Sequence, residues 1–202
     1  MDTYSYLAHH GIFANTQTGN IVLFAVHGSG GDWAAAARHL PPVGAFILGV
    51  GAATLLGVWL QGHPFRAALL CQGIELVVLG CLALFADRMP DAGVVPVISF
   101  VAALQNTSFG SIGPWTFNNA MTTGNIRNAT SGLLLWLIRR NPESNRGKVI
   151  VAASACFSFL AGALCGGVCT RYYSHEALAP CVGLVLAGFL LTWRRRGLEL
   201  TQ

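Results

Sequence analysis

The sequence predicts an all-α fold: a polytopic transmembrane helical bundle of two homologous halves, with six to eight membrane segments and a truncated first helix. Three observations predict it: a composition poor in charge, a series of long apolar runs, and an internal repeat. Only 10% of the 202 residues are charged and 53% are hydrophobic, with a mean hydropathy of +0.56. Because a water-soluble domain carries about 25% charged residues, this composition suits a surface that faces lipid.

Apolar runs of the right length for membrane helices follow one another along the chain. A spanning helix needs about 20 mostly apolar residues, and a fifth run beyond the four best is apolar only in its first part. Two shorter segments are compatible either with tilted spans or with half-helices buried in the bundle. The four runs are 43–60, 67–86, 149–170 and 177–193, the fifth is 93–113, and the short segments are 19–26 and 124–138.

Basic residues gather at the ends of the apolar runs, and their distribution predicts the orientation of the chain. Four of them lie within 139–148 and three within 194–196. If neither short segment spans, Arg66 and Arg127 join these two clusters on one side, and Arg38, Arg88 and Arg171 lie on the other. If both span, the same two clusters still share the more basic side. The positive-inside rule therefore predicts a cytoplasmic C-terminus in either layout.

An internal repeat divides the predicted single membrane domain, 1–202, into halves 1–86 and 93–193. Residues 13–21, FANTQTGNI, resemble 117–126, FNNAMTTGNI, with one extra residue in the second copy. The first half lacks a counterpart of about 96–104, so its first helix is expected to be truncated. Duplicated halves are typical of transporters, although other membrane proteins also contain them.

The sequence Thr-Gly-Asn occurs once in each half and interrupts an apolar context. A helix broken at membrane depth offers N–H groups to an anion or carbonyls to a cation. Alternatively, the threonine and asparagine simply cap the helix that follows. The density of polar side chains nearby favours a polar cavity over hydrogen bonding between helices alone. The predicted substrate-binding residues are Asn15, Thr18, Gly19, Asn20, Gln105, Asn106, Asn119, Thr123, Gly124 and Asn125.

Three ionisable residues are expected within the membrane: Asp2, Glu75 and Arg127. Such groups are costly in lipid unless they are paired or hydrated, and they are candidates for function. Glu75 is the strongest candidate because it lies deep in an apolar run, one helical turn beyond Gln72. Asp2 is close to the chain terminus, and Arg127 could extend its side chain to the cytoplasmic face.

Several functions are disfavoured. The six cysteines lie inside apolar runs, without a C-x-x-C pair or a nearby histidine, so no metal site and no cofactor are predicted. His9 and His10 are adjacent and would diverge on a helix. No motif assembles a catalytic set, which argues against an enzyme. The basic residues form no stripe on a soluble domain, which argues against nucleic-acid binding.

Small residues recur every four positions in the 43–60 run, at Gly49, Ala53 and Gly57. This spacing places them on one helix face, where they permit the close packing of helices in lipid. We interpret the pattern as structural.

The motifs together resemble the YoaK family of bacterial inner-membrane proteins, which is catalogued as a domain of unknown function. The resemblance is carried by MDTYSYL at 1–7, FANTQTGN at 13–20, GAFILG at 44–49, ALQN at 103–106 and TTGN at 122–125. It implies a polytopic protein of about six spans in the bacterial cytoplasmic membrane. It supplies no catalytic or ligand residues.

Three hypotheses for the function follow. The first is a transporter or channel for a small solute or ion, with a polar site between the two Thr-Gly-Asn elements. The second is a non-transporting assembly or sensor protein, in which internal hydrogen bonds occupy the polar cluster. The third is a membrane-embedded enzyme. The expected partners are the lipid bilayer and an unidentified small solute or ion, and a homo-oligomer is compatible with the sequence.

Overall fold

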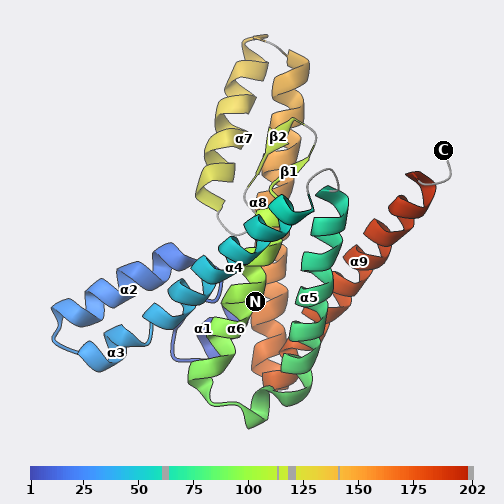
Figure 1. Cartoon of the computed structure of the whole chain (residues 1–202). Coiled ribbons are helices and arrows are strands. Elements are labelled where there is room, and N and C mark those ends of the chain that lie inside the picture. Colours follow the sequence, from blue (N-terminus) through green and yellow to red (C-terminus); the bar gives the residue numbers. More distant parts are fainter. Residues whose placement is uncertain (61–63, 113, 118–121, 141, 200–202) are drawn as a thin grey trace. The chain divides into compact units, whose positions relative to one another are not determined.

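The computed structural model describes residues 1–60, 64–112, 114–117, 122–140 and 142–199 (Figure 1). Within these ranges the chain is helical apart from loops and one hairpin of two-residue strands, which confirms the all-α class. It divides into two compact units. Unit 1 comprises Met1–Ser108 and Gly166–Gln202, and unit 2 comprises Phe109–Cys165. These units do not follow the halves of the predicted repeat, which stays a prediction.

Unit 1 begins with three shorter helices and continues with long apolar ones. Helices α5 and α6 are joined by the 3₁₀ turn η1, and η2 precedes α9. The last turns of α8 also belong to this unit. The elements are α1 (Asp2–Ala8), α2 (Gln17–Ser29), α3 (Trp33–Ala37), α4 (Leu40–Trp59), α5 (Pro64–Phe85), η1 (Ala86–Arg88), α6 (Asp91–Ser108), η2 (Ser174–Leu178) and α9 (Ala179–Glu199).

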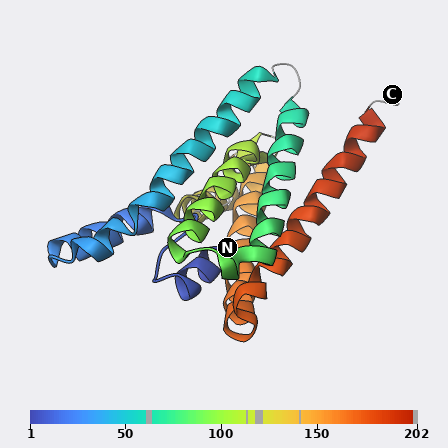
Figure 2. The same ribbon diagram turned by 60° about the horizontal axis from the view of Figure 1, so that its bottom comes forward.

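The core of unit 1 lies along α6, which packs against both α4 and α5 (Figures 1 and 2). From Val101 to Leu104 every side chain of α6 is at most 1% exposed. The closest approach is at Gly49 of α4, where an added Cβ would lie 2.4 Å from the carbonyl oxygen of Phe100. The predicted small-residue stripe therefore forms the α4–α6 contact at Gly49 and at the buried Ala53, whereas Gly57 is exposed.

Unit 2 holds the strands β1 (Ser111–Ile112) and β2 (Trp115–Thr116), the helix α7 (Thr122–Leu137) and most of α8 (Pro142–Tyr173). Helices α7 and α8 run antiparallel: Thr122 lies beside Cys156, and Gly132 lies beside Val149. The hairpin packs on α8 through Trp115, whose indole covers Gly147 and donates to the Ser144 carbonyl over 3.2 Å.

Four helical segments are long and apolar enough to cross a membrane: Trp33–Trp59, Phe65–Phe85, Glu143–Tyr173 and Glu176–Arg194. Residues Ala92–Ser108 of α6 form a shorter apolar helix. Large apolar side chains on these segments are exposed, as at Leu48 (70%) and Leu84 (76%), and a lipid environment would cover them. The chain is therefore a multi-pass membrane protein, while the count of six to eight segments stays a prediction.

Candidate functional site

The loop between α1 and α2 is held by the carboxylate of Asp2. Its two oxygens accept hydrogen bonds from the backbone N–H of Asn15 (2.6 Å), from the hydroxyl of Thr16 (2.6 Å) and, more weakly, from the Thr16 N–H (3.4 Å). Ser5, one turn along α1, accepts a further bond from the Ala14 N–H over 3.0 Å. The predicted intramembrane carboxylate thus accepts three hydrogen bonds from two residues of this loop.

Asn20, in the first Thr-Gly-Asn element, closes the same loop from α2. Its amide oxygen accepts from the Phe13 N–H (3.0 Å), and its amide nitrogen donates to the Phe13 carbonyl (2.7 Å) and to Gln17 Oε1 (2.9 Å). Asn20 is wholly buried, Thr18 is exposed, and Gly19 lies under the Phe13 ring, which an added Cβ would meet at 2.7 Å. Three adjacent residues therefore have three different environments.

The polar network reaches α6 through one hydrogen bond between side chains. Asn106 donates from its amide nitrogen to Asn15 Oδ1 over 2.9 Å, across 91 residues of sequence. Gln105, its neighbour on α6, is half-buried. The structure thus brings together Asp2, Asn15, Asn20 and Asn106 among the residues predicted for the site. Sequence reasoning missed Ser5 and the role of Phe13: the motif at 13–20 contains Phe13, but its hydrogen bonds depend on the path of the loop.

The second Thr-Gly-Asn element lies in unit 2, in the first turn of α7, as the first element lies in the first turn of α2. Thr123 is exposed, Gly124 is half-buried and Asn125 is 2% exposed. The second element therefore has an exposed threonine and a buried asparagine, as the first element does. Arg127 is exposed on α7, and Asn119 lies outside the described residues. Both motifs therefore lie in the first turn of a helix, and at α2 the N-cap residue is Thr16, without a side-chain cap hydrogen bond, so the alternatives of a cap and a binding site both stay predictions.

A different feature of unit 1 is the buried carboxylate of Glu75. Glu75 is 0% exposed, and neither of its carboxylate oxygens has a hydrogen-bond partner among the described residues. Gln72, one turn earlier on α5, is 8% exposed, and its amide oxygen is likewise unpaired within the described part of the chain. Its amide nitrogen points towards α9, where an added Cβ at Gly188 would lie 3.2 Å away.

The surroundings of Glu75 are apolar. Cys71 and Leu79, one turn before and after it on α5, are buried in the core cluster that α6 and η2 complete. Helix α5 lies between α6 and α9 and packs against both. Among the described residues no group of three or more His, Cys, Asp or Glu side chains could hold a metal ion. The Glu75 carboxylate oxygens and the Gln72 amide oxygen, one turn apart, are therefore buried without a hydrogen-bond partner among the described residues.

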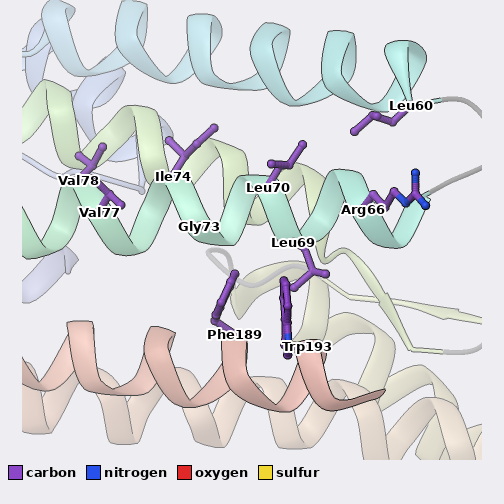
Figure 3. Close-up of a pocket in the computed structure, with 10 residues that line it drawn as sticks. All are labelled: Leu60, Arg66, Leu69, Leu70, Gly73, Ile74, Val77, Val78, Phe189 and Trp193. Atoms are coloured by element: carbon purple, nitrogen blue, oxygen red, sulfur yellow. The ribbon is translucent and has the colours of Figure 1, made fainter. Parts of the chain in front are cut away.

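A groove separates α5 from α9 on the outer side of the same helix pair (Figure 3). Its volume is about 630 Å³, and its lining is apolar except for Arg66 at one end. Phe189 and Trp193 of α9 point towards α5 and stack with their ring centres 6.1 Å apart. Since Arg66 and Trp193 line one groove, the start of α5 and the end of α9 lie at the same end of unit 1.

Comparison with known proteins gives a family and no further relative. The model of the family described as "Protein of unknown function (DUF1275)" matches residues 1–191. No curated protein and no solved structure matches the chain. The expectation of a family of unknown function is confirmed, while the YoaK name for the resemblance stays a prediction.

Proposed function

We propose that this chain, which belongs to the DUF1275 family of proteins of unknown function, transports a small solute or ion, with Glu75 as the group that binds a cation or proton. The observation that carries the proposal is the burial of the Glu75 carboxylate without a partner among the described residues. An unpaired ionised group in a membrane helix costs several kcal/mol, and residues that retain such a group commonly mark ion or proton pathways.

The chemistry of the Glu75 and Gln72 side chains determines which charge the ligand carries. A carboxylate and an amide oxygen are both acceptors, so Glu75 and Gln72 suit a proton or a small cation and repel an anion. A proton or cation bound at Glu75 would also offset the free-energy cost of desolvating the carboxylate. Gln72 lies on the same face of α5 as Glu75, three residues away, which allows both to contact one ion.

In this proposal the first Thr-Gly-Asn element has a structural role. The Asn20 amide is occupied by Phe13 and Gln17, and the Asp2 carboxylate is occupied by the loop at 15–16. A substrate at Asn20 would have to displace these bonds. We therefore assign the ion to Glu75, and the predicted site between the two elements stays a prediction.

The experiment is an ion-flux measurement on the purified full chain in proteoliposomes. Proton flux is followed with an internal pH-sensitive dye, and sodium and potassium fluxes with tracers. We expect flux of one of these cations in the wild type, and a loss of about tenfold or more in Glu75→Gln, which keeps the shape and removes the charge. Glu143→Gln, the same change at an exposed residue, is the matched control and should retain the flux.

A second candidate function is a non-transporting assembly or sensor protein. The occupation of the Asp2 and Asn20 side chains by internal hydrogen bonds favours it, since that hypothesis expects the polar cluster to be fully used. Absence of proton, sodium and potassium flux in a folded wild-type protein would support this candidate. Equal flux in the wild type and Glu75→Gln would remove Glu75 from the mechanism.

A further inference from the structure

We propose that the groove between α5 and α9 binds one anionic phospholipid, with an acyl chain along the groove and the phosphate at Arg66 (Figure 3). This proposal is independent of transport, because it concerns the outer face of the helix pair and not the buried face that carries Glu75.

The length of the groove fits an acyl chain from one leaflet. Its lining on α5 extends from Arg66 to Val78, which is about 18 Å along a helix axis. The hydrocarbon core of one leaflet is about 15 Å thick, half of the bilayer core. A chain that starts at the Arg66 end would therefore finish near the bilayer centre, where Val77 and Val78 end the groove.

The two ends of the groove differ in chemistry. The lining from Leu69 to Val78 is apolar, whereas the other end carries the exposed guanidinium of Arg66 and the half-exposed indole of Trp193. Trp is enriched at the level of lipid headgroups, and arginine pairs with phosphate through two parallel hydrogen bonds. Arg194, also exposed, follows Trp193 and adds positive charge at the same end. Charge complementarity therefore favours an anionic headgroup over a zwitterionic one.

The groove owes its depth to Gly73. An added Cβ there would meet only the Phe189 ring, at an ordinary contact distance of 3.8 Å, so a longer side chain would extend into the groove. Gly80, two turns further along α5, has no atom within 4 Å of an added Cβ and does not line the groove. The two glycines form a matched pair in one helix.

The test is native mass spectrometry of the full chain, extracted in neutral detergent from vesicles of equal phosphatidylglycerol and phosphatidylcholine. We expect one phosphatidylglycerol per wild-type chain. Arg66→Gln should reduce the preference for phosphatidylglycerol about fivefold, whereas Arg66→Lys should retain most of it. Gly73→Leu should release the lipid, and Gly80→Leu should not.

Three results would overturn the proposal. If the wild type and Arg66→Gln retained the two lipids in the same ratio, Arg66 would select no headgroup. Unchanged lipid retention in Gly73→Leu would show that the lipid lies elsewhere. A species of two chains without lipid, lost in Gly73→Leu, would show that the groove is a contact between copies of the chain. Arg66→Gln changes an exposed side chain, so the test does not depend on the folding of Gly73→Leu.

Discussion

At the scale of single residues, the first Thr-Gly-Asn element joins a helix start to the loop before it. The Asn20 side chain makes three hydrogen bonds, two of them to the backbone of Phe13. The chain reaches this arrangement because it reverses at His10 and Gly11, whose φ angles of 55° and 73° lie in the left-handed region. Glycine adopts that region without strain, and histidine does so more rarely.

We predict that Asn20→Ala destabilises the protein and that Thr18→Ala does not. Loss of the Asn20 amide leaves the Phe13 N–H and carbonyl without partners, which should lower the free energy of unfolding by about 2 kcal/mol. Thr18 is exposed, so its removal should change the free energy by less than about 0.5 kcal/mol. Thermal unfolding of both variants in mild detergent measures the difference. An unchanged melting temperature in Asn20→Ala, together with lost cation flux, would instead indicate that Asn20 binds a ligand.

The sequence could identify Asn20 and Glu75 as candidates but not their roles. The repeat and the break in hydropathy singled out Asn20, and Phe13 begins the same repeated motif, yet the hydrogen bonds between the two depend on the path of the loop. Glu75 was recognisable because an ionisable residue deep in an apolar run is rare. Whether a partner faces it depends on which residues of α6 and α9 pack against α5, and helix packing cannot be read from one sequence.

At the scale of elements, the contact between α4 and α6 depends on the absence of a side chain at Gly49. The backbone of α6 approaches so closely that an added Cβ would lie 2.7 Å from the Ala103 Cβ as well as 2.4 Å from the Phe100 oxygen. The four-residue spacing predicted that Gly49, Ala53 and Gly57 share a face. It could not predict where the two helices diverge, and Gly57 lies beyond that point, with no atom within 4 Å of an added Cβ.

We predict opposite outcomes for the same substitution at these two glycines. Gly49→Ala forces the α4 and α6 backbones apart and should lower the free energy of unfolding by about 1–3 kcal/mol. Gly57→Ala meets open space and should leave it unchanged or raise it by up to about 1 kcal/mol, since alanine favours the helix. Unfolding in increasing denaturing detergent compares both with the wild type. Equal destabilisation by the two changes would mean that α4 packs along its whole length.

At the scale of the whole molecule, the groove constrains the number of membrane crossings. Arg66 and Trp193 line one groove, so the chain between them must cross the membrane an even number of times. The candidate spans in α5, α8 and α9 give three crossings, so one of the shorter helices α6 and α7 must supply a fourth, and not both. Because α6 is the more apolar of the two, we propose that it makes the fourth crossing and that residues 124–138 do not span, the layout in which Arg66 joins both basic clusters. We propose that this side is the cytoplasm of a bacterial cell, by the positive-inside rule.

This layout predicts which positions a charged thiol reagent reaches from each side of the membrane. In a background without the six native cysteines, Arg139→Cys and Arg194→Cys should both be labelled from the cytoplasmic side, because α8 and α9 together return the chain to the side from which α8 starts. Arg88→Cys, after α5, should be labelled only from the opposite side. All three residues are exposed, so access does not depend on unfolding. Labelling of Arg139→Cys together with Arg88→Cys would mean that α6 and α7 either both cross the membrane or both do not. The C-terminus would then lie opposite Arg66, and the groove that joins Arg66 to Trp193 would not form in the bilayer.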